Sequence, residues 1–118
     1  MGRGVRTAVD SGGTLVSRGE VWWVEDPSAG RRPHLVLTRD GAIPVVNAVL
    51  AVPATTSIRG IPTEVALGRE DGMPTECVLT VDNTTLLPKG FFIERICTLG
   101  PERMASVCQA LTHATGCR

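Results

Sequence analysis

The chain has 118 residues, and its 12 Lys and Arg residues balance its 12 Asp and Glu residues, so the formal net charge at pH 7 is zero. This length fits one domain with a single modest core. A chain without net positive charge has little long-range attraction for nucleic acid, so any site for a polyanion must be a local cluster of cations. Arginines form such a cluster along the middle of the sequence: Arg31, Arg32, Arg39, Arg59 and Arg69.

The N-terminal segment is expected to lie outside the fold. Its apolar positions between Val5 and Val16 are interrupted by charged residues and a glycine pair, so they form no targeting signal. Residues 1–17 are rich in Gly, Ser, Thr and Arg and predict a flexible arm. Residues 18–118 are expected to form one folded domain.

Cysteine usage favours a reducing compartment. The four cysteines include no Cys-x-x-Cys pair, and no cluster rich in histidine or carboxylate accompanies them, so we expect no metal site. Buried thiols in a reducing cytoplasm are the expected state. No apolar run has the length of a membrane span, and no Gly-rich loop with Lys and Ser/Thr predicts a bound nucleotide. We therefore expect a cytoplasmic protein that needs no cofactor and no membrane.

Short runs of β-forming residues between Gly, Pro, Asp and Asn turn signals predict most of the fold. The near-continuous apolar character of residues 45–52 predicts a strand buried on both faces. Tight turns between short strands indicate a small, strongly bent sheet or partial barrel of five to six antiparallel strands. The predicted strands cover residues 19–25, 34–39, 45–52, 61–67, 77–81 and 91–98.

The last segment predicts a helix that closes the sheet. Pro101 suits the first helical turn, where its missing N–H costs nothing, and Gly116 is a plausible stop. Between them an apolar stripe repeats at helical spacing and is expected to cover the sheet: Met104, Val107, Cys108 and Leu111.

Polar residues lie at matching ends of two predicted strands. Arg31 and Arg32 come just before the second strand, and Thr55 and Thr56 come just after the third. If these strands pair antiparallel, the start of one lies beside the end of the other. A guanidinium and a hydroxyl at one rim of the sheet could grip and polarise a phosphodiester. The alternative is an arginine in solvent and a threonine pair that merely ends a strand.

The remaining candidates for chemistry are few. His34 could act as an acid or base, or it could be structural, because its side chain should point away from that of its strand neighbour. Trp22 and Trp23 should face opposite sides of a strand, with one in the core and the other able to stack on a base or to cover an interface. Arginine and threonine suit the cleavage of RNA, which carries its own nucleophile, the 2′-hydroxyl.

The order of short motifs resembles the MazF/PemK family of toxin endoribonucleases over about residues 18–111. The opening of that family resembles residues 18–24 (RGEVWWV), then Asp26-Pro27, Gly30 and residues 32–37 (RPHLVL). Its central segment resembles residues 52–56 (VPATT) followed by residues 59–65 (RGIPTEV), and its second half fits Asp82-Asn83 and residues 96–99.

The resemblance implies an SH3-like barrel that forms a homodimer and cuts single-stranded RNA (mRNA, rRNA or tRNA) at a short base motif without a metal. Attack by the 2′-hydroxyl would leave a 2′,3′-cyclic phosphate and a 5′-hydroxyl. A cognate antitoxin would neutralise the enzyme with an acidic, flexible tail. The family's catalytic arginine and threonine correspond to Arg32 and Thr55. RNA-binding positions are then expected at Arg31, His34, Thr56, Ser57 and Arg59.

One feature departs from the family pattern, and two other functions stay open. Only Arg31 separates Gly30 from Arg32, so the loop that covers RNA in many members is short and basic here. A gyrase-poisoning toxin of the CcdB type would share the fold, although the end of this chain, Gly116-Cys117-Arg118, has no aromatic anchor. A non-catalytic RNA-binding barrel would keep the arginines but would not need Thr55.

Overall fold

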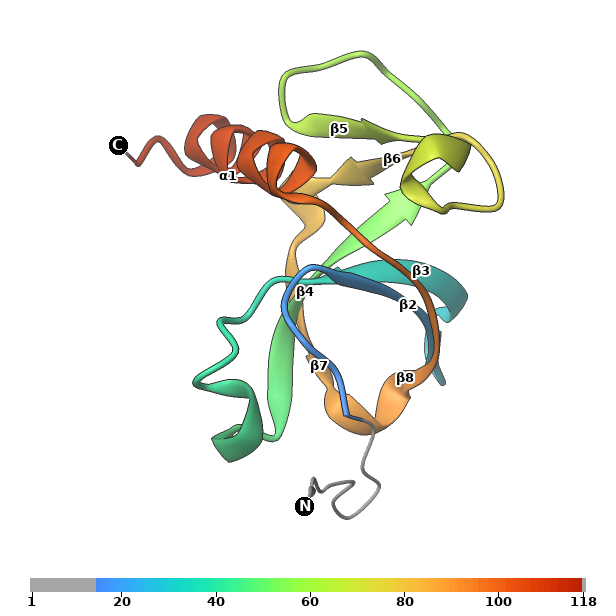
Figure 1. Ribbon diagram of the computed structural model, residues 1–118, viewed down its shortest axis with the longest axis vertical. Helices are drawn as coiled ribbons and strands as arrows, with labels where there is room; N and C mark the ends of the chain where they lie inside the picture. Colours follow the sequence, from blue (N-terminus) through green and yellow to red (C-terminus); the bar gives the residue numbers. More distant parts are fainter. Residues whose placement is uncertain (1–14, 118) are drawn as a thin grey trace.

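Antiparallel strand pairing builds most of the molecule. The computed structural model describes residues 15–117, which contain seven strands and one α-helix (Figure 1). The elements in chain order are β2 (Glu20–Asp26), β3 (Gly30–Val36), β4 (Ala48–Thr55), β5 (Glu64–Leu67), β6 (Cys77–Thr80), β7 (Thr85–Pro88), β8 (Phe92–Thr98) and α1 (Pro101–Thr115). The order across the sheet is β5-β6-β4-β3-β2-β8, with β7 paired to β4. The prediction of a mostly β fold with a C-terminal helix is confirmed, with seven strands where five to six were expected.

The strand that the sequence prediction missed is β7, which follows a turn and ends at Pro88. A run of four residues between turn signals is too short to show a strand pattern of its own. Its extended conformation comes from pairing with β4, where Val49 lies opposite Leu87 and Leu50 lies opposite Leu86. This strand therefore depends on a distant partner.

The β2–β3 hairpin closes earlier than predicted. Asp26 pairs with Gly30, so β3 begins at Gly30 and not at His34. Asp26 Oδ1 accepts hydrogen bonds from the Ser28 N–H at 2.9 Å and the Ser28 hydroxyl at 2.8 Å, and these bonds lower the pKa of Asp26. Gly30 has a φ of +88°, which residues with a Cβ rarely adopt. The tight turn places the two arginines after Gly30 inside a strand.

Strand β4 lies further along the chain than the predicted range of residues 45–52. A 3₁₀ turn at Ile43–Val45 precedes it, and the strand continues through Pro53 to Thr55. Pro53 lies where β4 changes partners, because it pairs with β3 while pairing with β6 begins at the next residue. A residue without an N–H is tolerated at such an interruption of the ladder.

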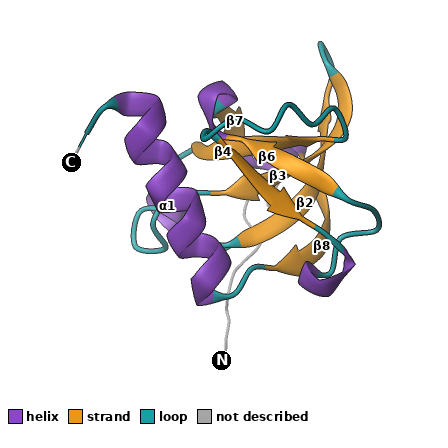
Figure 2. Cartoon of the chain, turned by 90° about the horizontal axis from the view of Figure 1, so that it is seen from above, coloured by secondary structure: helices purple, strands orange, loops and turns teal. Residues whose placement is uncertain are grey.

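Two apolar clusters occupy opposite faces of the central strands. In β4, Val52 and Ala54 belong to the first cluster, whereas Val49 and Ala51 belong to the second. This alternation confirms that the strand is buried on both faces. Figure 2 shows α1 lying against one side of the sheet, where Val107 joins the first cluster.

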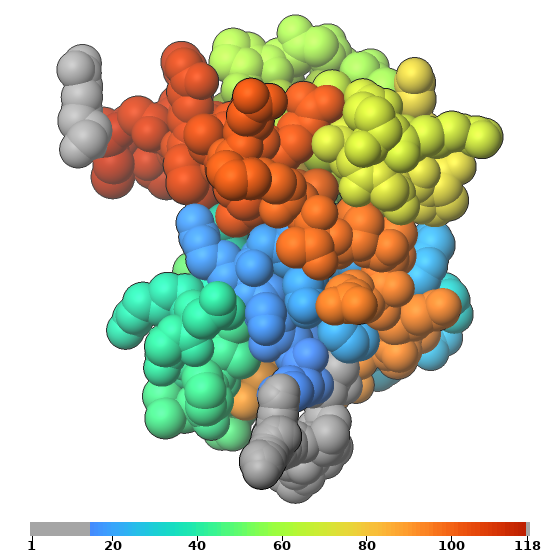
Figure 3. Space-filling view, viewed as in Figure 1, coloured from blue at the N-terminus to red at the C-terminus, as the bar shows by residue number. Residues whose placement is uncertain are grey.

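Helix α1 follows its prediction closely. It begins at Pro101, and Gly116 ends it with a φ of +74°. Val107 is fully buried, but Cys108, which was assigned to the apolar stripe, is exposed. In the space-filling view the helix and the segment around residues 60–76 form one continuous surface (Figure 3). The Arg103 guanidinium joins these parts by an ion pair with Asp71 at 2.9 Å.

The folded part begins earlier than the predicted boundary at Arg18. Val16 is 3% exposed and belongs to the second apolar cluster. Of the predicted arm of residues 1–17, residues 1–14 lie outside the described part of the chain. Among the described residues, no helix combines the length and the apolar character needed to cross a membrane.

Candidate functional site

The strand register brings Arg32 and Thr55 together. Pairing between β3 and β4 ends at His34 and Pro53. Extending that register by two residues sets Arg32 opposite Thr55 on the same face of the sheet. Here β4 leaves β3 and pairs with β6, with Thr55 opposite Val78. The antiparallel geometry predicted from the sequence thus exists at a place where the sheet opens.

These two residues line one pocket of about 280 Å³, which we call the β3–β4 pocket. Its walls come from the end of β3, the strands β4, β5 and β6, and the loop between β4 and β5. On β5 and β6, Glu64 lies opposite Thr80, which places both on the face that carries Thr55. The lining consists of Arg32, Thr55, Ser57, Arg59, Ile61, Thr63, Glu64, Thr80, Asp82 and Asn83.

Backbone hydrogen bonds hold the loop that carries two of the predicted RNA contacts. Thr55 Oγ1 accepts a hydrogen bond from the Ser57 N–H at 3.1 Å. The Glu64 carboxylate accepts from the Arg59 N–H at 3.0 Å and from the Gly60 N–H at 2.9 Å. Gly60 has a φ of +73°. These bonds fix the loop while the side chains of Ser57 and Arg59 remain exposed.

The carboxylates that line the pocket form hydrogen bonds with groups other than its two arginine side chains. Glu64 directs its charge at two backbone N–H groups, and Asp82 Oδ2 accepts a hydrogen bond from the Thr63 hydroxyl at 2.6 Å. Neither Arg32 nor Arg59 forms an ion pair within residues 15–117. The pocket therefore presents two guanidinium groups that have no ion-pair partner among the described residues, one of them beside a threonine hydroxyl, and this is a suitable site for a phosphate.

Arg31 lies on the opposite face of β3 and does not line the pocket. Its guanidinium carbon is 4.9 Å from the centroid of the Trp23 ring, and its Nη2 is 3.8 Å from Glu94 Oε1. Trp22, which was expected to lie on the other face from Trp23, packs against the second apolar cluster and donates its Nε1–H to Glu20 at 2.9 Å. Both tryptophans are half-buried, so the expected division into one core and one surface residue holds only in part.

His34 is buried, with 9% of its surface exposed, and it does not line the pocket. Its Nδ1 lies 3.3 Å from the Arg32 carbonyl oxygen, so Nδ1–H donates to that carbonyl. Burial lowers the pKa of His34, the Arg32 carbonyl raises it, the Arg32 charge lowers it and Asp26 raises it, with a net decrease. His34 thus stabilises the backbone of Arg32 through this hydrogen bond. Because its side chain is buried, it is poorly placed to contact RNA. Thr56 is exposed but is also outside the lining.

Several lining residues had no role in the sequence prediction. Neither Glu64, within the predicted strand of residues 61–67, nor Asp82-Asn83 is among the residues that the sequence predicts for the site. Each is distant in sequence from Arg32, and only the pairing of β4 with β6 brings them to one pocket. The alternation of polar and apolar residues along a strand does not indicate which polar residues will line a pocket. Among residues 15–117, no group of three or more His, Cys, Asp or Glu side chains could hold a metal ion.

Comparison with known proteins identifies the group to which these features belong. The sequence matches, over residues 17–115, the family described as PemK-like, MazF-like toxin of type II toxin–antitoxin system. The sequence is 39% identical over 104 residues to a probable endoribonuclease MazF5 of Mycobacterium tuberculosis, and the match covers 87% of this chain and 95% of the relative. It is 42% identical to a probable endoribonuclease MazF2 of the same species over 101 residues, covering 85% and 98%. A solved mycobacterial endoribonuclease in complex with its cognate antitoxin has a TM-score of 0.79 and 31% identity, covering 88% and 98%.

Proposed function

Because the chain belongs to the PemK/MazF family of type II toxin–antitoxin toxins, we propose that it is a toxin endoribonuclease that cuts single-stranded RNA at a short base motif. The observation that carries this proposal is the convergence of Arg32 and Thr55 in one pocket with a second free guanidinium, that of Arg59. The names of the relatives, which are endoribonucleases, support it. We place the reaction in the cytoplasm, where RNA is the substrate.

The proposed reaction uses the substrate's own nucleophile. The 2′-hydroxyl loses its proton to water as its oxygen attacks the adjacent phosphorus, the bond to the 5′-oxygen breaks, and that leaving oxygen gains a proton, so the number of protons is unchanged. Arg32 stabilises the negative charge of the phosphorane and aids the departure of the 5′-oxygen. Thr55 Oγ1 already accepts the Ser57 N–H, so its hydroxyl hydrogen is free to donate to a non-bridging oxygen. The products are a 2′,3′-cyclic phosphate and a 5′-hydroxyl, and no metal takes part.

RNA contacts outside the reacting phosphate are assigned by position. Ser57 and Arg59 line the pocket, so we assign them direct contacts with the RNA strand. Thr56 and Arg31 are exposed outside the pocket lining, Arg31 on the other face of β3, and we assign them to flanking nucleotides. His34 is retained only as a support for Arg32, because its side chain is buried.

An acidic, flexible tail of a cognate antitoxin would compete with RNA for the same cations. A carboxylate-rich peptide and an RNA strand both present negative charge to Arg32 and Arg59, so simultaneous binding is unfavourable. The solved mycobacterial relative bound to its antitoxin supports a partner of this kind. RNA and antitoxin peptide should therefore each weaken the binding of the other.

A homodimer is the proposed assembly, although its apolar surface is not the one that exposed aromatic residues of the Trp22-Trp23 and Phe91-Phe92 pairs would provide. Phe92 is 1% exposed, and both tryptophans are half-buried, so these aromatic residues leave little surface to cover. Other apolar side chains are exposed instead, among them Val45, at 82%, and the cross-strand pair Leu50 and Leu86, at 43% and 61%. Sedimentation at micromolar concentration that shows only a monomer would contradict the dimer.

The central test is cleavage of end-labelled RNA in the presence of EDTA. The wild-type protein should release fragments ending in a 2′,3′-cyclic phosphate, and a 2′-deoxyribose at the cut position should abolish the reaction. Binding without cutting would indicate the non-catalytic barrel, and poisoning of gyrase without RNA cleavage would indicate the CcdB-type toxin. Cleavage that requires a metal and leaves a 5′-phosphate would refute the mechanism.

A further inference from the structure

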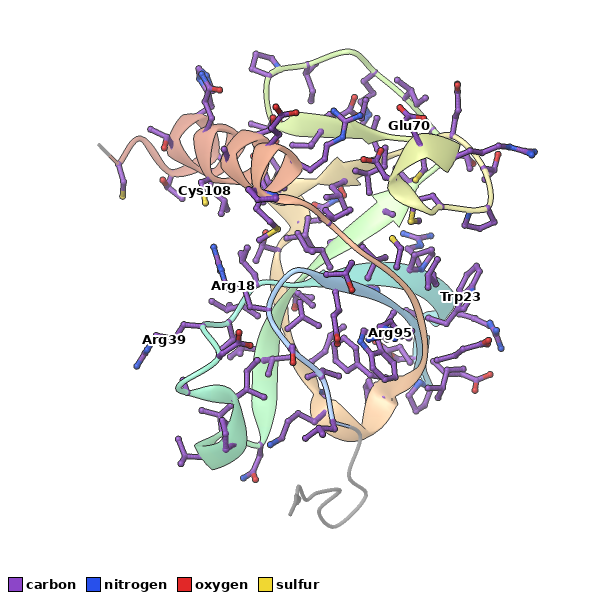
Figure 4. The ribbon with its side chains drawn as sticks, viewed as in Figure 1. Arg18, Trp23, Arg39, Glu70, Arg95 and Cys108 are labelled. Carbon is purple, nitrogen blue, oxygen red and sulfur yellow. The ribbon has the colours of Figure 1, made fainter. Side chains whose placement is uncertain are left out.

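The short β2–β3 hairpin creates a second polar surface on the face of β3 opposite to the pocket. The Arg31 guanidinium lies over the Trp23 ring at 4.9 Å and approaches Glu94 at 3.8 Å. The Arg31 side chain is 48% exposed, so part of it stays accessible to a ligand. Figure 4 shows Trp23 at the side of the molecule opposite to Arg39. We call this arrangement the Arg31–Trp23 shelf.

Three contacts hold the shelf in one orientation. Arg31 belongs to a strand, where it pairs with Glu25, so its backbone is fixed. The indole supports the guanidinium from one side, and the Glu94 carboxylate restrains its edge. A planar cation restrained over a ring in this way loses little further freedom when a second planar group stacks on it.

The edge of β3 between the shelf and the pocket is open. Pairing with β4 stops at His34, and β4 turns away to β6. Pro33 offers no N–H, and within residues 15–117 no strand pairs with this side of Gly30 to Pro33. Arg31 and Arg32 have α-carbons about 3.8 Å apart, as across any trans peptide. A strand of RNA can therefore pass over this edge from the pocket to the shelf.

We propose that the Arg31–Trp23 shelf stacks the base of a nucleotide that flanks the cut phosphate, in a sandwich of indole, guanidinium and base. This inference rests on the proposed function. Unpaired bases of RNA stack on aromatic rings and on arginine planes. Because every base has a π face, the shelf tolerates all four bases but favours the larger purines. It strengthens substrate binding and takes no part in the chemical step.

The experiment couples a change in the protein with the removal of one base at a time. An RNA that the wild-type protein cuts is prepared with an abasic ribonucleotide at each position flanking the cut, and kcat/KM is measured for wild type, Arg31→Ala, Arg31→Lys and Arg39→Ala. Arg31→Lys keeps the positive charge but removes the planar guanidinium group on which a base could stack. Arg39, which the sequence grouped with the other arginines, is exposed on the other side of the molecule and does not line the pocket, so Arg39→Ala removes an equal charge away from the proposed site.

At one flanking position, removal of the base should lower the wild-type kcat/KM by about fivefold to a hundredfold, as expected for one stacked base. The same removal should have little effect in Arg31→Ala and Arg31→Lys, and the full effect in Arg39→Ala. The loss should lie in KM. Equal abasic effects in wild type and Arg31→Ala at every position, or full rescue by lysine, would overturn the shelf while leaving the endoribonuclease proposal intact. A wild-type protein that neither cuts nor binds RNA would contradict both the shelf and the endoribonuclease proposal.

Discussion

Arginine serves two different purposes in this molecule. Arg103, on α1, donates to Asp71 at 2.9 Å and lies 3.4 Å from Glu70, so its charge is compensated. Arg32 and Arg59 face the β3–β4 pocket without an ion pair in the described part of the chain. An arginine paired with a carboxylate, such as Arg103, joins two elements of the fold. An arginine without an ion-pair partner beside a hydroxyl, such as Arg32, can bind an anion.

The carboxylates divide in the same way. Asp71 accepts from Arg103 and from the Gly68 N–H at 2.9 Å, and both bonds stabilise the contact of its turn with α1. Glu64 lies in the pocket but accepts from backbone N–H groups, so it orders the loop without neutralising a guanidinium side chain. Changes at the two regions should therefore separate activity from stability.

The largest effect is expected for Arg32→Ala. Removing a cationic donor that is proposed to act mainly in the transition state should lower the rate of RNA cleavage by roughly a hundredfold to a thousandfold. The side chain is exposed, so the thermal unfolding midpoint should stay close to that of the wild type. Single-turnover cleavage and calorimetry measure the two quantities. A cleavage rate that hardly changes would remove Arg32 from the mechanism.

Thr55→Val should have the second largest effect on cleavage. The substitution keeps the branched shape but removes the hydroxyl that is proposed to donate to a phosphate oxygen. A neutral donor contributes less than a cation, so the rate should fall by roughly tenfold to a hundredfold. Thr85→Val is the matched control, because Thr85 is an exposed threonine at the start of β7 that does not line the pocket, and it should keep nearly full activity. Equal losses in both variants would argue against a special role for Thr55.

Glu64→Ala should act on binding more than on chemistry. The loop would lose the acceptor for the Arg59 and Gly60 N–H groups, and KM for RNA should rise about fivefold, the equivalent of roughly one net hydrogen bond. Glu64→Gln keeps an acceptor oxygen and should recover much of the loss. If the glutamine variant failed as badly as the alanine variant, the charge of Glu64 and not its loop contacts would be important.

Arg103→Ala should leave cleavage unchanged and lower the free energy of unfolding slightly, by about 1 kcal/mol or less, because the pair is partly exposed. Burial raises the pKa of Asp71, but the Arg103 hydrogen bond, the Gly68 N–H and the Arg103 charge outweigh it, and the pKa falls below its ordinary value of 3.8. The stabilisation is therefore present above pH 3.8 and is lost as pH falls through the lower folded-state value. Denaturant titrations of both proteins from pH 7 downward should converge in acid, and a difference that grew in acid would contradict this account.

The chain by itself determined the elements whose signals are local. Pro101, Gly116 and the apolar spacing between them defined α1, because capping and helical periodicity act within a few residues. The position of Arg32 beside Thr55 followed from two apolar runs and the geometry of an antiparallel pair. The order of short motifs also identified the family, which the comparisons confirm.

Tertiary structure alone decided the features that need a distant partner. β7 is a strand because β4 lies beside it, and Glu64 and Asp82 reach the pocket because β4 exchanges β3 for β6. The burial of His34 and the seat of Arg31 on Trp23 depend on how early the β2–β3 hairpin closes. Strand register turns each side chain to one face or the other, and a shift of a single residue reverses the choice, so these positions are settled only when the strands pair.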